Sequence, residues 1–220
     1  MSRPLFPEID QRSMKLIVGV IALTLPVLTD YFAALAGEPL DSISESYWRG
    51  YWPQTIFVGF LFAIASFLIA YNGKSTREMV AAKLAAAAAL GVAMFPCGCG
   101  GEEEMIPGLH YVSATVMFAI LAYFCYLFLM RALEKGHAQA RARAGIYALC
   151  GIAIVLCILA LGYNGMTDGS VSERLDGFVF WAEAGALWSF GVSWLTASHV
   201  LPVINRPDER FRVLGARQAA

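Results

Sequence analysis

Long apolar runs alternate with short polar linkers along the whole chain. The apolar runs cover approximately residues 14–36, 52–71, 80–95, 109–133, 145–163 and 178–204. A helix needs about 20 mostly apolar residues to cross the hydrocarbon core of a bilayer. Most of the runs reach this length, and the run at 80–95 reaches it only by continuing into the cysteine- and glycine-rich segment. Since lipid offers the backbone no hydrogen-bond partners, each span must be helical.

The pattern therefore predicts an all-α fold, a bundle of six transmembrane helices within one domain, residues 1–205. A basic tail, 206–220, follows and is expected to be loose. The third and sixth runs are rich in alanine, glycine and serine. Small residues let helices approach closely in lipid, so we expect these two helices inside the bundle.

The linkers alternate in charge. All but two of the 16 basic residues, Arg49 and Arg174, lie at the termini or in the second and fourth linkers. The remaining linkers are acidic and hold Glu38, Asp41, Glu45, Glu102, Glu103, Glu104, Asp168, Glu173 and Asp176. Basic residues mark the cytoplasmic side of a membrane protein. We therefore expect both termini in the cytoplasm and the acidic loops outside.

Composition agrees with a membrane protein. Hydrophobic residues make up 58% of the 220 residues and charged residues 15%, whereas about a quarter of a soluble domain is charged. The net charge of −1 gives no argument for nucleic acid. Membrane lipids are the expected partners, with a homo-oligomer or a larger membrane complex left open.

Ala34 and Ala36 resemble a signal-peptidase site, but the preceding run is long and follows Glu8 and Asp10, so we expect a retained helix.

Several ionisable or polar residues fall in or beside the outer halves of the apolar runs. Such residues are costly in lipid and are candidate functional sites. They are Asp30, Ser44, Glu45, Arg49, His110 and Glu183. We expect them to line a pocket open to the outer side. Two interpretations stay open: Arg49 pairs with Glu183 or Asp30 to relieve buried charge, or Arg49 holds an anionic headgroup while His110 and a carboxylate exchange protons.

The segment around Cys97 and Cys99, followed by His110, offers ligands that suit zinc or copper. One residue between the thiols is too few for a zinc knuckle, and it favours neither a relaxed disulfide nor two-thiol chelation. The alternative is a glycine-rich turn that ends a proline-broken helix. We therefore predict no cofactor. His137 and His199 lie on the other side from His110, which weighs against a membrane hydrolase with several histidines around one zinc.

A family resemblance rests on short motifs. They are Ser42-Ile43-Ser44, Phe57-Val58-Gly59, Phe95-Pro96, His110 to Ala114, Phe180 to Glu183, and Phe190 to Leu195. In these the chain resembles a bacterial family of six-span membrane proteins and, more loosely, the FRAG/DRAM-like class of lipid-associated proteins. The resemblance implies a six-helix bundle in the bacterial inner membrane, with periplasmic acidic loops and no established activity.

The leading hypothesis is a protein with an outward-facing pocket for a lipid headgroup or small amphiphile. The alternatives are a proton-coupled transporter using Glu183 and Asp30, an intramembrane lipid-modifying enzyme using His110, and a structural subunit. The sequence assigns no catalytic residue. Tyr-Asn-Gly ends the second and fifth runs, which hints at an inverted repeat of transporters but is also an ordinary helix stop.

Overall fold

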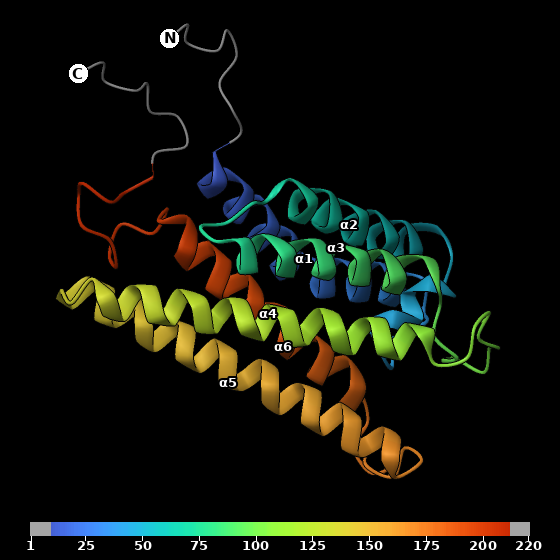
Figure 1. The fold of residues 1–220 in the computed structure, drawn as a ribbon. Helices are drawn as coiled ribbons and strands as arrows, with labels where there is room; N and C mark the ends of the chain where they lie inside the picture. Colours follow the sequence, from blue (N-terminus) through green and yellow to red (C-terminus); the bar gives the residue numbers. More distant parts are fainter. Residues whose placement is uncertain (1–9, 212–220) are drawn as a thin grey trace, which may run out of the picture.

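The all-α prediction is confirmed in the computed structural model, which describes residues 10–211 (Figure 1). Within this part of the chain, six α-helices and one short 3-10 helix are present and no strand is found. They are α1 (Gln11–Leu35), η1 (Ser44–Tyr47), α2 (Tyr51–Ala70), α3 (Thr76–Met94), α4 (Leu109–Glu134), α5 (Ala138–Met166) and α6 (Phe178–Ser198). Residues 212–220 of the predicted tail lie outside the described residues.

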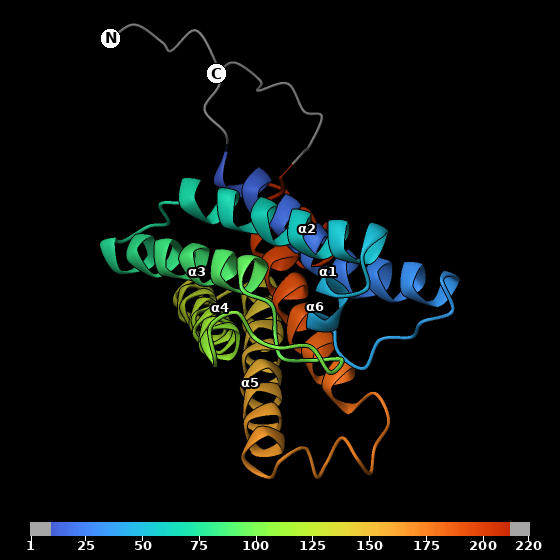
Figure 2. The ribbon, with the colours of Figure 1, turned by 90° about the vertical axis from the view of Figure 1, so that its right-hand side faces the viewer.

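The helices pack in chain order into a ring. Each α-helix contacts the next along the chain, and α6 closes the ring by packing on α1. α6 also contacts α4 across the ring, and Figure 2 shows it in the middle of the assembly, between α1 and α5. This arrangement agrees with the inner position expected for the small-residue run that became α6.

Four helices, α1, α2, α4 and α5, are long and apolar enough to cross a membrane. α3 and α6 are similar in length, with 19 and 21 residues, but do not belong to this group. α3 carries Arg77, Glu78 and Lys83, and α6 carries Glu183 among several tryptophan and serine residues. The coarse prediction of long apolar helices is therefore confirmed for four of the six.

Three helix boundaries differ from the predicted spans by four residues or more. α5 begins at Ala138 rather than 145, and α3 begins at Thr76 rather than 80. In both cases the added residues include charged side chains, and the helix begins earlier because a side chain at the N-cap accepts a backbone N–H: His137 from Ala140, and Ser75 from Glu78. α6 ends at Ser198 rather than 204, since the next residue has a left-handed φ of 62° and so terminates the helix.

The up-and-down arrangement separates charge to the two ends of the bundle. The end formed by the start of α1, the α2–α3 and α4–α5 turns and the residues after α6 is called here the basic end. It holds Arg12, Lys15, Lys74, Arg131, Lys135 and Arg143. The end formed by the other three connections is called the acidic end, and Glu38, Asp41, Glu45, Glu104 and Glu183 lie there.

An aromatic cluster fills the bundle interior towards the basic end. Trp194 of α6, 0% exposed, lies 5.4 Å from Tyr71 and 5.7 Å from Phe124 between ring centroids. Phe128 and Phe190 complete the cluster at 6.2 Å and 5.2 Å from Trp194. In lipid, helices associate through packing rather than through the hydrophobic effect, so the contacts of this cluster join α2, α4 and α6 to one another.

Candidate functional site

Ser44, His110 and Glu183 form a continuous hydrogen-bonded chain at the acidic end. The 3-10 helix η1 presents Ser44 to the first turn of α4, where His110 Nε2 lies 3.0 Å from Ser44 Oγ. Ser44 Oγ also lies 3.1 Å from Glu183 Oε1. Glu183 Oε2 accepts the backbone N–H of Ile43 at 2.6 Å. The 3-10 helix η1 and the starts of α4 and α6, distant in sequence, therefore meet at one buried polar group.

The Ser44–His110–Glu183 chain holds one exchangeable proton besides the hydrogen of the Ser44 hydroxyl. His110 Nδ1 lies 2.8 Å from the carbonyl oxygen of Phe95, so Nδ1 carries a hydrogen and donates it. If the imidazole is neutral, Nε2 accepts the Ser44 hydroxyl, and Glu183 must then be protonated to bond the same oxygen. If Glu183 is ionised, Nε2 must itself carry a hydrogen. The arrangement can therefore pass a proton between an imidazole and a carboxyl through one hydroxyl.

Arg49 pairs with neither Glu183 nor Asp30, contrary to one sequence-based interpretation. Arg49 Nη2 donates to Glu45 Oε1 at 2.7 Å, and Nη1 lies 3.4 Å from Glu38 Oε2. The physical reason is local: Glu45 lies four residues before Arg49 across η1, and Glu183 is already occupied by the amides at the start of η1. Glu45 also accepts the N–H of Asp41 at 2.9 Å, which folds the α1–α2 loop around this pair.

Asp30 stands apart from the other five residues. It is half-buried on α1, and no hydrogen bond or ion pair joins it to another residue within 10–211. The six residues predicted for one pocket thus divide into the Ser44–His110–Glu183 chain, the Glu45–Arg49 pair and the separate Asp30. Their role in ligand binding stays a prediction.

A cavity of about 420 Å³ lies between the end of α1 and the start of α2 at the acidic end. Its walls are mainly apolar, formed by Phe32, Leu35 and Trp52, and Glu38 and Arg49 provide its charges. Phe32 and Trp52 stack at 5.7 Å between ring centroids. Such a combination of apolar walls and a few polar groups is typical of a small-molecule site.

Cys97 and Cys99 are paired as a disulfide. Their spacing did not favour a bond, but the turn at Gly98 brings the two Cα atoms to 5.2 Å, within the usual range for disulfides. Trp48 Nε1 donates to the Cys97 carbonyl at 2.9 Å and ties this turn to η1. Within the described residues, no group of three or more His, Cys, Asp or Glu side chains is placed to hold a metal ion.

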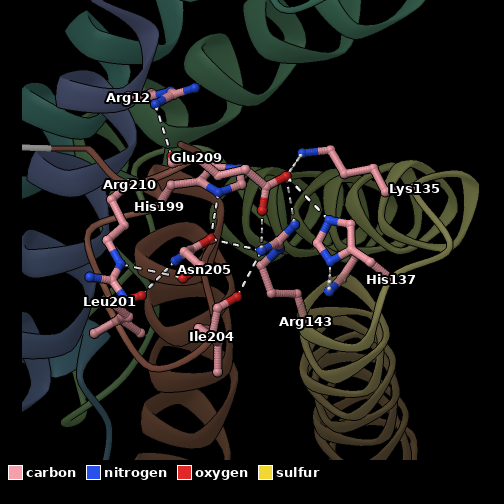
Figure 3. A network of polar contacts seen from close by, with 11 residues as sticks. Arg12, Lys135, His137, Arg143, His199, Leu201, Ile204, Asn205, Glu209 and Arg210 are labelled. Atoms are coloured by element: carbon pink, nitrogen blue, oxygen red, sulfur yellow. Dashed lines mark hydrogen bonds and ion pairs between the residues drawn. The ribbon is translucent and has the colours of Figure 1, made fainter. Parts of the chain in front are cut away.

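A second polar network, at the basic end, was missed by the sequence analysis (Figure 3). Its centre is Glu209, which accepts from Lys135 Nζ at 2.5 Å and from Arg143 Nη1 at 3.0 Å. Arg12 Nη1 donates to the Glu209 backbone carbonyl at 3.1 Å. Residues 206–211 are therefore held against the bundle at the basic end. For these residues the prediction of a loose tail is wrong.

The network shifts the titration of two side chains beyond the end of α6. Partial burial would raise the pKa of Glu209, but hydrogen bonds from Lys135 and Arg143 lower it to about 2. Burial lowers the pKa of His199 to about 4, and the positive charges of Arg143, Lys135 and Arg12 act in the same direction. His199 is therefore neutral at pH 7 and binds Asn205 Oδ1 at 2.6 Å through Nδ1.

Glu78, also unforeseen, is buried at 0% exposure near the same end. It accepts hydrogen bonds from Arg131 to both carboxylate oxygens, from the Tyr71 hydroxyl at 2.5 Å and from the Lys74 backbone N–H at 2.8 Å. The sequence does carry a signal for it, because Ser75 and Glu78 have the spacing of a capping box.

No family model, curated protein or solved structure matches this chain.

Proposed function

We propose that this chain is a six-span integral membrane protein of the bacterial inner membrane, with both termini in the cytoplasm, that holds a zwitterionic lipid headgroup at its acidic end. Four helices of sufficient length and apolarity support membrane insertion. The separation of basic from acidic connections supports the orientation. The resemblance to six-span bacterial proteins points the same way.

The observation that carries the ligand proposal is the α1–α2 cavity. Its volume of about 420 Å³ is in the range of small-molecule sites. Its charged groups are one guanidinium, on Arg49, and one carboxylate, on Glu38. Since Glu45 also contacts Arg49, the surroundings carry no excess positive charge, and a purely anionic headgroup would be repelled by Glu38. A phosphate joined to an ammonium group matches both charges.

The hydrogen-bonding and charged groups around the cavity suit this ligand. Arg49 Nε has no hydrogen-bond partner within the described residues, and because it is buried, its donation to a phosphate oxygen requires the side chain to turn towards the cavity. The Glu38 side chain is 55% exposed and is available to an ammonium group. Tyr51 and Trp52 beside the cavity are 91% and 61% exposed, as expected of aromatic residues at a membrane interface. Acyl chains would then extend along α1 and α2.

Native mass spectrometry of the full chain released from a mild detergent tests the proposal. Phosphatidylethanolamine and phosphatidylglycerol are supplied in equal amounts. We expect the wild type to retain phosphatidylethanolamine preferentially, Arg49→Gln to lose this adduct by at least tenfold, and Glu38→Gln to lose the preference. Arg174→Gln is the control, because it removes the other arginine of the acidic end, which is exposed and does not line the cavity.

Equal retention of both lipids by the wild type, or equal loss in Arg49→Gln and Arg174→Gln, would overturn the proposal. Arg49→Gln also frees Glu45, so the folded state of each variant is checked by its thermal unfolding. If Arg49→Gln unfolds early, Glu38→Gln carries the test, since within residues 10–211 this exposed carboxylate pairs only with Arg49.

A second candidate, an acyl-transfer or hydrolytic enzyme, rests on one contact. Ser44 Oγ lies 3.0 Å from His110 Nε2, and the other ring nitrogen is held by a carbonyl, which is the orientation that a general base needs to activate a serine. Ser44 and His110 are only 8% and 2% exposed, so a substrate would require an opening of η1. Labelling by a fluorophosphonate, lost in Ser44→Ala but kept in Ser46→Ala, would favour this candidate; no labelling would exclude it.

A further inference from the structure

A small cavity opens at the basic end, between the start of α1 and the facing ends of α4, α5 and α6. It measures about 60 Å³, whereas one water molecule needs roughly 10–15 Å³. The space is therefore large enough for a single tetrahedral oxyanion. Cationic side chains dominate its lining: Lys15, Lys74, Arg131, Lys135 and Arg143.

The charge of this lining is not balanced. Two carboxylates pair with three of the five cations: Glu78 with Arg131, and Glu209 with Lys135 and Arg143. Five positive charges less two negative charges leave an excess of three. His199, which also lines the cavity, is neutral and adds no charge. Such an excess around one concave site attracts an anion of high charge density.

Lys15 is the side chain that most needs a partner. It is 8% exposed, so it is more than nine-tenths buried, and its ammonium group makes no hydrogen bond within residues 10–211. Its nitrogen lies 4.8 Å from the ring centroid of Phe128 and 5.5 Å from that of Tyr71. These rings offset part of the cost of burial, but they accept none of the three N–H donors in the ordinary way. The donors remain available to the cavity.

The other cations differ in how fully they are used. Arg143 donates to Ile204, Asn205 and Glu209, and Arg131 is committed to Glu78. The Lys74 ammonium has no carboxylate partner in the described part of the chain, and Lys135 uses one donor on Glu209. Three ammonium groups thus converge with free donors on one cavity, beside two arginines that are each paired with a carboxylate.

We propose that this cavity binds a phosphate group, either as a free phosphate ion or as the phosphate of a lipid headgroup, with Lys15 at its floor. This site lies at the opposite end of the bundle from the headgroup site proposed above and does not depend on it. Phosphate supplies several acceptor oxygens and up to two negative charges, which match the free ammonium donors and the excess of charge. Lys135, whose side chain is 41% exposed, lies at the open side, where a headgroup would enter.

The experiment uses the full chain purified in detergent, with two separate ligands at constant ionic strength. Inorganic phosphate is compared with chloride, and dihexanoyl phosphatidic acid is compared with dihexanoyl phosphatidylcholine. Binding is followed by the shift in thermal unfolding and by titration of tryptophan fluorescence. Lys15→Met keeps the length of the buried side chain without its charge, and Lys74→Gln alters an exposed lining residue. Arg77→Met is the matched control, because it removes a charge at the same end from an exposed residue outside the cavity.

We expect at least one phosphate-bearing ligand to stabilise the wild type. We also expect Lys15→Met to weaken that binding by at least tenfold, Lys74→Gln by about threefold or more, and Arg77→Met by less than twofold. Stabilisation by inorganic phosphate identifies a free ion as a sufficient ligand, and stabilisation by phosphatidic acid alone identifies a lipid. If Lys15→Met does not fold, Lys74→Gln against Arg77→Met decides. Binding of neither ligand, or equal binding by the lining variants and the control, would overturn the proposal.

Discussion

At the scale of single residues, backbone groups of the connections help to hold the buried carboxylates of this protein. Glu183 accepts two backbone N–H groups at the start of η1, and Glu78 accepts one from the α2–α3 turn. Hydrogen bonds to the charged or polar oxygen offset the loss of hydration that burial imposes. These residues therefore determine how the connections fold over the two ends of the bundle.

Ser44→Ala should destabilise the protein, because it leaves His110 Nε2 and Glu183 Oε1 without their shared partner. We expect a loss of about 1–3 kcal/mol, the usual cost of an unsatisfied buried polar group, measured as a lowered midpoint of denaturant-induced unfolding in detergent. Ser46→Ala is the control. Ser46 is 0% exposed and its hydroxyl has no partner in the described structure, so its removal should be neutral. Equal effects of the two substitutions would contradict the proposed role of Ser44.

Glu209 should make stability depend on acid pH. Its pKa is lowered to about 2 in the folded protein from about 4.3 in an unfolded chain. The carboxylate therefore stabilises the fold fully above about pH 5 and loses this contribution as pH falls towards about 2. Thermal unfolding between pH 7 and pH 3 should decline less steeply in Glu209→Gln than in the wild type. Parallel declines would show that the network around Glu209 does not contribute.

At the scale of elements, the apolar pattern predicted the six α-helices of the described chain, but neither the 3-10 helix η1 nor every helix end. α5 starts at Ala138 although Arg141 and Arg143 suggest a linker, because Arg143 turns inward and binds Glu209. That contact joins residues far apart in the chain, and no local pattern can indicate it. Glu209 was missed because its partners also lie far away in the chain. Glu78, by contrast, could have been found from the capping-box spacing of Ser75 and Glu78. Of the predicted site, the sequence placed Ser44, His110 and Glu183 at one end, but their mutual contacts depend on the fold of η1.

The contact between α1 and α6 depends on two glycines that face each other. A Cβ atom added at Gly191 would lie 2.9 Å from the Gly19 carbonyl oxygen and 2.7 Å from Leu23, so the helix backbones would have to separate. Gly191→Ala should therefore destabilise the protein by about 1–3 kcal/mol through overpacking. Gly59→Ala, in α2 with open space around it, should be neutral or slightly stabilising, since alanine favours a helix. Thermal unfolding of both variants measures the difference, and similar midpoints would argue against close α1–α6 packing.

At the scale of the whole molecule, the bundle has two chemically different ends joined by an apolar middle. The acidic end carries a proton-sharing chain beside a cavity with one positive and one negative group, and the basic end carries a cavity with excess positive charge. The aromatic cluster around Trp194 fills the interior next to the basic cavity. This apolar filling disfavours a continuous polar path from one end to the other. The two ends would therefore bind their ligands independently.

The topology is testable because a six-span and a four-span arrangement place the same two connections, after α3 and after α4, on opposite sides of the membrane. If all six helices cross the membrane, alkaline phosphatase fused after Glu104 should be active in the periplasm, and a fusion after Lys135 should be inactive. If only α1, α2, α4 and α5 cross, these two results reverse, while a C-terminal fusion is inactive in both cases. A fluorescent protein at the same points gives the complementary signal. We expect the six-span result, because α3 and α6 pack within the closed ring of helices and all basic residues except Arg49 and Arg174 then face one side.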